Sequence, residues 1–154
     1  MSPKKILILT KKFRHPDGSL WLTSELAYDL AKRGHDVTVL NLDWAGQGAL
    51  ANTIEINGRL KVFNFKAIRL SGVNISLALR WLLSSFQLFP FIFKRILVGD
   101  RYDLFITFSP CTPLYSVIPL AHLISKDSFL VYWDFFPIHN QEISGKIPKI
   151  LLLP

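Results

Sequence analysis

Cysteine is nearly absent from this sequence, since Cys111 is alone among 154 residues. A single cysteine cannot form a disulfide within the chain, which excludes a small disulfide-stabilised scaffold. The four histidines are scattered and, together with Cys111, show no spacing typical of metal ligands, so we expect no metal site. A lone cysteine is also typical of proteins kept in a reducing compartment.

The sequence also lacks a long hydrophobic run. The stretch from Trp81 to Phe93 has 13 residues and contains Pro90, whereas a membrane-spanning helix needs about 20 apolar residues. Near the start of the chain, Lys4 and Lys5 precede only four apolar residues, fewer than the roughly 7–15 of a secretory leader. We therefore expect no spanning helix and no leader, and we predict a cytoplasmic chain.

Acidic residues are few, because 11 Asp and Glu stand against 18 Lys and Arg and leave a net charge of +7. The excess lies in residues 55–101, where eight basic residues face only Glu55 and Asp100. Such a charge predicts an anionic partner, and the candidates are phosphorylated substrates, lipid head groups and nucleic acid. Residues 59–66 interleave basic and aromatic side chains, but no RNA-recognition, helix-turn-helix or zinc pattern accompanies them, so we expect no nucleic-acid partner.

Apolar residues are abundant, at half of the chain, and 13% of the residues are aromatic. This composition excludes a disordered protein, and the length predicts a single domain over residues 1–154. Apolar runs alternate with helical patterns, which is typical of an α/β fold with a parallel sheet and helices on both faces. We predict a Rossmann-like domain with the parallel strands in the order 3-2-1-4-5.

The first half of the chain predicts a strand–helix–strand unit followed by a small hairpin. The helix is expected to be capped by Ser19 and to end at Gly34, because serine favours an N-cap and glycine the left-handed position after a helix. The hairpin is expected near residues 54–65, around Asn57-Gly58, which is a strong two-residue turn signal. One of its two runs, 54–56 or 60–65, is expected to supply the third parallel strand.

The second half predicts further helices and strands. Residues 74–97 have a helical pattern that we expect to be interrupted at Pro90. A strand is expected at 102–108, a helix after it to about Ser125, and a fifth parallel strand at 129–133.

Several of these segments together resemble a known family. The first is the loop with Asp17-Gly18-Ser19 and the stretch LAKRGHDVTVL at residues 30–40. The second is Tyr102–Thr107, followed by Ser109-Pro110 and by the segment from Val131 to Pro137. In these segments the chain resembles the N-terminal half of family 4 glycosyltransferases, and within them the enzymes that build bacterial O-antigen, capsule or colanic-acid-like polysaccharides.

The resemblance implies an acceptor-binding domain of the GT-B architecture, without the second domain that binds the donor. Such an enzyme transfers a sugar from a nucleotide-sugar donor to a lipid-linked glycan, needs no further cofactor, and works at the inner face of the cytoplasmic membrane. Two alternatives stay open. The chain is a non-catalytic, membrane-associated subunit of a split glycosyltransferase with a separate donor-binding subunit, or it is an inactive truncated remnant.

The resemblance also implies roles for individual residues. Asp134 follows the fifth expected strand, where the family places a group that binds or deprotonates the acceptor hydroxyl, and His139 is the second candidate for this catalytic role. The loop of Asp17, Gly18 and Ser19 is expected to face the donor phosphates, with Ser19 where the family has a second glycine. The acceptor is expected to contact three side chains that follow strand ends, His15, Ser109 and Thr112.

An apolar segment in the middle of the chain predicts contact with a membrane surface. Residues 77–97 combine aromatic side chains with cations at both ends, which is the pattern of a helix that lies in a bilayer interface. The alternative is a buried helix whose aromatic side chains pack on the sheet. The side chains expected to face an anionic membrane are Arg80, Trp81, Phe89, Phe91, Phe93, Lys94 and Arg95.

Overall fold

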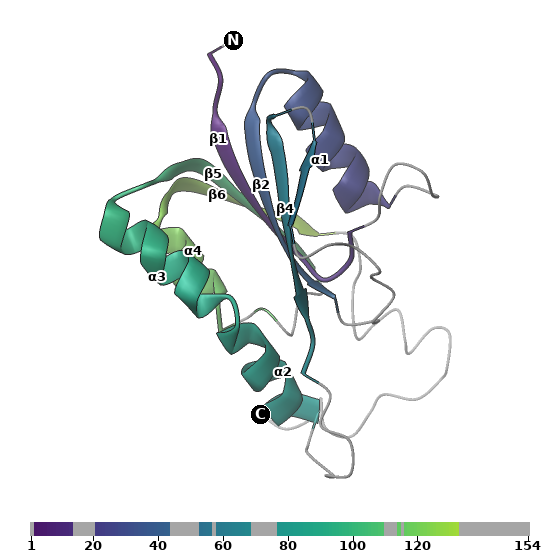
Figure 1. Ribbon diagram of the computed structural model, residues 1–154, viewed down its shortest axis with the longest axis vertical. Helices are drawn as coiled ribbons and strands as arrows, with labels where there is room; N and C mark the ends of the chain where they lie inside the picture. The colour runs from purple at the N-terminus through teal and green to yellow at the C-terminus, as the bar shows by residue number, and fades with distance from the viewer. Residues whose placement is uncertain are drawn as a thin grey trace.

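The computed structural model of the chain describes residues 2–13, 21–43, 53–56, 58–68, 77–109, 114 and 116–132. A single twisted sheet crosses the middle of this part (Figure 1). One helix, α1, covers one face of the sheet, and α2, α3 and α4 lie on the other face (Figure 1). The predicted α/β class with helices on both faces is confirmed.

The sheet has the strand order β3-β4-β2-β1-β5-β6. All neighbours pair in parallel except β3, which is antiparallel to β4 and forms the predicted hairpin with it. Numbered along the chain, the parallel strands therefore follow the order 3-2-1-4-5, which confirms the predicted Rossmann-like topology. The strands are β1 (Lys5–Thr10), β2 (Asp36–Asp43), β3 (Thr53–Ile56), β4 (Leu60–Lys66), β5 (Tyr102–Ser109) and β6 (Ser125–Tyr132).

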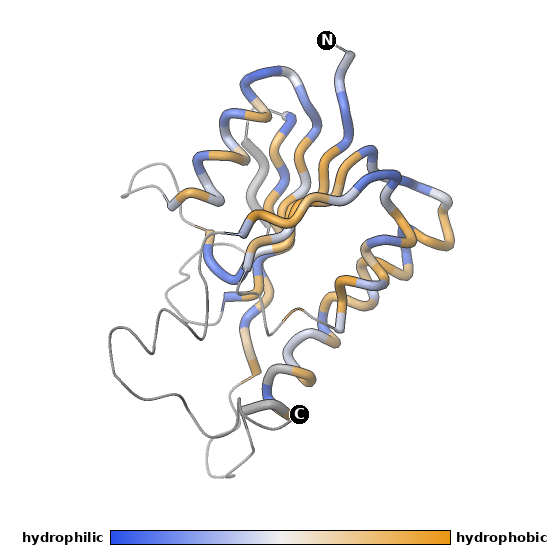
Figure 2. Tube along the Cα trace, turned by 180° about the vertical axis from the view of Figure 1, so that it is seen from behind, coloured by the Kyte–Doolittle hydropathy of each residue, from blue (hydrophilic) through white to orange (hydrophobic). Residues whose placement is uncertain are grey.

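The central strand β1 is apolar on both faces because helices cover both sides of the sheet. Ile6 and Ile8 belong to the core under α1, whereas Leu7 and Leu9 belong to the core under α3 and α4. None of these four side chains is more than 2% exposed. Figure 2 shows the hydrophobic stretches of neighbouring strands side by side in the middle of the molecule.

Helix α1 (Leu22–Lys32) begins later than the predicted Ser19 cap, which is a correction. Its first turn follows Trp21, whose extended backbone places the carbonyl to accept hydrogen bonds from the backbone N–H groups of Ser24 and Glu25. The buried residues of α1 are Thr23, Ser24 and Ala27, whereas Leu22 is 46% exposed. The predicted C-terminal end is confirmed, since Gly34 has a φ of 91°, which favours glycine.

The predicted helix over residues 74–97 is two helices, α2 (Leu77–Phe86) and α3 (Phe89–Val98). The predicted interruption at Pro90 is wrong, because the break precedes this residue and Pro90 lies in the first turn of α3. A proline in the first turn costs no hydrogen bond, since the first backbone N–H groups of a helix have no partner within it. The break is held by Gln87, whose side-chain amide donates hydrogen bonds to the carbonyls of Lys66 and Ser84.

Helix α4 (Ile118–Leu123) is shorter than predicted, and β6 begins four residues earlier than the expected strand at 129–133. The hydroxyl of Ser125 donates to the carbonyl of Ala121 and ends the helix. On the next residue, the ammonium of Lys126 lies 2.7 Å from a carboxylate oxygen of Asp103 on β5. This ion pair joins the two strands where the local sequence is polar.

Candidate functional site

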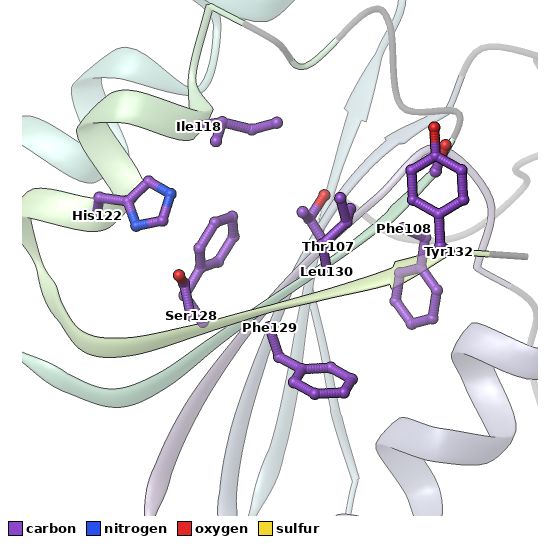
Figure 3. A pocket seen from close by; sticks show the side chains of 10 residues that line it. Thr107, Phe108, Ile118, His122, Ser128, Phe129, Leu130 and Tyr132 are labelled. Carbon is purple, nitrogen blue, oxygen red and sulfur yellow. The ribbon is translucent and has the colours of Figure 1, made fainter.

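A hollow of about 210 Å3 lies between α4 and the two strands β5 and β6 at one edge of the sheet. Residues of all three elements line it (Figure 3). Ligands of open α/β sheets bind beyond the carboxyl ends of the strands. Because Ser109 and Tyr132 are the last residues of β5 and β6 and both line the hollow, it reaches this end of the sheet.

The alternation of side chains along the strands builds the floor of the hollow. Phe105, Thr107 and Ser109 are spaced by two on β5, so they share one face of the sheet. The parallel register places Ser128, Leu130 and Tyr132 of β6 beside them, in that order. Hydroxyl-bearing and apolar side chains therefore lie next to each other along the whole floor.

Thr107 is the most deeply placed polar residue of the hollow. It is 5% exposed, and its Oγ1 has no hydrogen-bond partner within the described part of the chain. A buried hydroxyl without a partner costs about 1–3 kcal/mol, and such groups are rare in folded proteins. The structure therefore contains an unused hydrogen-bonding group at the floor of a hollow.

His122 on α4 lies at one end of the hollow. Its ring stands edge-on to Phe105, with centroids 5.5 Å apart and an angle of 84° between the planes. Figure 3 shows His122 near Ser128, Thr107 in the middle, and Tyr132 toward the other end. Both residues are exposed to solvent, Tyr132 to 60%.

A second feature lies on the same side of the sheet. Several large apolar side chains of α2 and α3 are exposed, and Leu97 and Val98 reach 84% and 71%. The ring of Phe89 connects the two helices, since its centroid lies 4.7 Å from that of Phe86 and 6.5 Å from that of Phe93. We call this set the α2–α3 surface; it consists of Leu79, Leu82, Phe86, Phe93, Ile96, Leu97 and Val98.

The predicted membrane-facing residues divide between this surface and the core. Phe93 and Lys94 are exposed as expected. The expectation is corrected for Phe89 and Phe91, which are partly buried and pack against the core. The ring of Phe91 packs at a tilt against that of Phe63 on β4, with 4.9 Å between the centroids, because its position on α3 turns it toward the sheet.

The predicted cations are also more constrained than expected. Arg95 pairs with Asp100 and lies over the ring of Phe91, with 5.2 Å between the guanidinium carbon and the ring centroid. Arg80 is partly buried on α2. Trp81 belongs to α2, but its side chain lies outside the described atoms. Lys94 is therefore the best-placed of the predicted cations for an external partner.

Of the other predicted site residues, Ser109 alone belongs to the described part of the chain, where it lines the hollow. Four residues of the hollow were not predicted from the sequence, although a threonine inside an apolar strand was a visible signal: Thr107, Ser128, His122 and Tyr132. The predicted residues outside the description are Asp17, Gly18, Ser19, His15, Thr112, Asp134 and His139.

A cluster of charges lies at the opposite end of β5. Asp100 accepts a hydrogen bond from the ammonium of Lys5 at 2.8 Å and another from the guanidinium of Arg95. The hydrogen bond from Lys5, with help from Arg95, holds the pKa of Asp100 below its ordinary value of 3.8. The same contact raises the pKa of Lys5. This cluster joins β1 to the end of α3 and is structural.

Asp100→Asn is expected to lower the free energy of unfolding by about 1 kcal/mol at pH 7, because both cations lose a charged partner but are partly exposed. A depressed carboxyl pKa stabilises the fold above its unfolded value, and this stability is lost as the pH falls through the folded pKa. The difference between wild type and variant should therefore persist from neutral pH to about 4 and shrink below it. Urea unfolding at several pH values measures this.

The control is Asp29→Asn, which breaks the exposed pair with Arg33 on α1. A pair of this kind contributes about 0.3–0.5 kcal/mol, so the control should change stability less than Asp100→Asn. Equal effects of the two variants at neutral pH would contradict a structural role for the Asp100 cluster.

No cluster of three or more His, Cys, Asp or Glu side chains suited to a metal occurs among the described residues. Within the same residues, no helix combines the length and the apolar character needed to cross a membrane.

Comparison with known proteins adds little. Neither a protein-family profile nor a curated protein matches the chain. Among solved structures, the chain is similar to the C-terminal domain of a hydrogenase from Pyrococcus furiosus, with 17% identity and a TM-score of 0.49. The alignment covers 82% of this chain and 92% of that one. So low a similarity supports no conclusion, and the Rossmann-like α/β class rests on the strand order alone.

Proposed function

We propose that this chain is the acceptor-binding domain of a GT-B glycosyltransferase. Its reaction would transfer a sugar from a nucleotide-sugar donor to a lipid-linked glycan during synthesis of a bacterial surface polysaccharide. The family resemblance of residues 30–40 and 131–137 motivates the reaction class. The donor would bind to a separate domain or subunit, and transfer by this chain alone is not part of the proposal.

One observation carries the acceptor role. The hollow with its hydroxyl groups and the α2–α3 surface lie on the same side of the sheet, since α3 and α4 pack on the same core. A lipid-linked glycan has the matching composition, with a polar sugar at one end and a hydrocarbon chain at the other. A sugar in the hollow and a lipid on the α2–α3 surface would then occupy the same side of the sheet.

The α2–α3 surface also supports a location at the membrane. Exposed apolar side chains beside a cation favour the interface of an anionic bilayer, where each nearby Lys or Arg contributes about 1 kcal/mol. Lys94 on α3 and Arg101 just before β5 are both exposed. We therefore propose a peripheral position at the inner face of the cytoplasmic membrane.

The catalytic roles in this proposal come from the resemblance. Asp134 would orient or deprotonate the acceptor hydroxyl, with His139 as the second candidate, and the loop of Asp17, Gly18 and Ser19 would face the donor phosphates. In the sequence, Asp134 follows Tyr132, the last residue of β6, by two positions. His15 and Thr112 would add hydrogen bonds to the acceptor, beside Ser109.

The test compares three sets of anionic vesicles: plain, with a polyprenyl diphosphate, and with a polyprenyl-diphosphate-linked sugar. We expect about five-fold tighter binding to the sugar-bearing vesicles than to either of the others, because one or two hydrogen bonds in the hollow contribute about 1 kcal/mol. Co-sedimentation measures the affinity. Equal binding to the sugar-free vesicles would contradict an acceptor-binding role.

A second assay adds a panel of nucleotide sugars to the sugar-bearing vesicles and follows label into the lipid fraction. Transfer that Asp134→Asn abolishes would show catalysis by this chain alone. Vesicle binding without transfer would support the acceptor-binding subunit of a split enzyme. If the chain showed no binding and no transfer, the proposal would be overturned and an inactive remnant would be the better account.

A further inference from the structure

We propose that the hollow between α4, β5 and β6 holds a single neutral pyranose ring, with the hydroxyl of Thr107 bonded to a ring hydroxyl. The proposal rests on the proposed function only for the source of the sugar, which would be the acceptor glycan. Its evidence is the size of the hollow, the chemistry of its lining and the unpartnered Thr107.

The size of the hollow suits one ring. Its volume is about 210 Å3. A protein cavity of about 150 Å3 holds one benzene molecule, so a volume of this size accommodates one six-membered ring with its hydroxyl groups. An oligosaccharide would have to place its other units outside, beyond the carboxyl ends of β5 and β6.

The described lining disfavours a charged ligand. Among the described residues that line the hollow there is no Lys, Arg, Asp or Glu, and the titratable side chains are His122 and Tyr132. A phosphate or carboxylate placed on this floor would lose water without gaining an opposite charge beside it, which costs several kcal/mol. The diphosphate of a nucleotide sugar is therefore a poor occupant, whereas an uncharged ring carries no such penalty.

Thr107 distinguishes a sugar from a purely apolar ring. A hydrocarbon would cover its Oγ1 and leave the hydroxyl without a partner. A pyranose has C–H faces that pack on Phe105 and Leu130 and hydroxyls that reach Thr107, directly or after rotation of the threonine about χ1. Sites built to bond a buried hydroxyl reject ligands that lack one, because the polar group of the site then stays unpaired.

The remaining polar groups surround the ring. The hydroxyls of Ser109 and Ser128 lie on the same face of the sheet as Thr107, one at each side along the strands. His122 and Tyr132 lie toward the two ends of the hollow (Figure 3). Hydrogen-bonding groups therefore lie to either side of Thr107 along the floor, next to the apolar side chains of Phe105 and Leu130.

The test titrates isotope-labelled full-length chain with methyl glycosides of several hexoses, and with cyclohexanol and glucose 1-phosphate as comparison probes. We expect saturable NMR shifts of the methyl groups of Thr107, Ile118 and Leu130 with at least one glycoside, and weaker binding of both comparison probes. Thr107→Val should weaken glycoside binding about five-fold or more, and Thr107→Ser, which keeps the hydroxyl, by less than about two-fold.

The stability of the Thr107→Val variant tests whether the hydroxyl of Thr107 is unpartnered in the free protein. Replacing an unpartnered buried hydroxyl by a methyl group is neutral or stabilising, so Thr107→Val should keep or raise the Tm of the free protein while it loses the glycoside. The proposal would be overturned if Thr107→Val left the glycoside affinity unchanged, or if NMR shifts occurred only outside the hollow. Binding of cyclohexanol as tight as that of the glycosides would also overturn it.

The vesicle assay keeps the two proposals apart. Sugar-dependent vesicle binding that Thr107→Val leaves unchanged would overturn the pyranose site but retain the acceptor-binding function. Binding of a methyl glycoside in the hollow, without any preference for sugar-bearing vesicles, would retain the site and contradict the lipid-linked acceptor.

Discussion

Leu97→Glu should reduce binding of the chain to anionic vesicles by about 30–100-fold. Leu97 is the most exposed large apolar side chain of the α2–α3 surface, at 84%. Transferring a leucine side chain into an apolar environment contributes about 1.5–3 kcal/mol, and a carboxylate in its place must also leave water. A loss of about 2.1–2.8 kcal/mol corresponds to the stated change in affinity.

The matched control is Leu22→Glu. Leu22 is also an exposed leucine on a helix, at 46%, but α1 lies on the opposite face of the sheet (Figure 1). Leu22→Glu makes the same change in net charge as Leu97→Glu and should leave most of the vesicle binding intact. Co-sedimentation at several lipid concentrations measures both variants, and similar losses in the two would show that charge alone, and not the α2–α3 surface, governs binding.

The positive charge of Lys94 should contribute to vesicle binding, and this contribution should depend on the salt concentration. Lys94→Gln should weaken binding to anionic vesicles about five-fold, because one nearby cation contributes about 1 kcal/mol. This difference should shrink as salt is added, since the Debye length falls from about 10 Å at 0.1 M to about 3 Å at 1 M. Binding to neutral vesicles should change little, and the effect of Leu97→Glu should persist at high salt.

The strand order was predictable from the sequence because its signals are local and strong. The continuous apolar run of β1 requires helices on both faces, and Asn57-Gly58 marks a hairpin whose second run joins the parallel sheet as β4. The start of β6 carries no such signal. Its first four residues, 125–128, are polar and form a strand because β5 supplies hydrogen bonds and Asp103 holds Lys126.

The exposed face of α3 was not predictable for a related reason. Which side chains of a helix face the core depends on where the helix begins and how it docks, and Pro90 pointed to a break in the wrong place. The aromatic residues at 89, 91 and 93 were therefore all assigned to the membrane, whereas only Phe93 is exposed. The hollow was missed because the sequence does not show which buried hydroxyl finds a partner, and Thr107 does not.

Ile92→Ala is expected to lower the free energy of unfolding by about 2–4 kcal/mol. Ile92 is fully buried and packs in the core of Leu7, Leu9 and Leu88, so its truncation removes apolar contacts and leaves a cavity. Leu97→Ala, one and a half turns further along the same helix, should change stability by no more than about 0.5 kcal/mol, because Leu97 is exposed.

This pair tests the orientation of α3 on which the α2–α3 surface depends. Urea unfolding at neutral pH measures both changes, and circular dichroism shows whether each variant keeps its helices. If α3 were rotated so that Leu97 faced the core, the ranking would reverse, and the exposed apolar residues would be a different set. The expected result is a large loss in the free energy of unfolding for Ile92→Ala, with vesicle binding retained at a temperature where the variant is folded. It would show that the inner face of α3 stabilises the domain and that the outer face binds lipid.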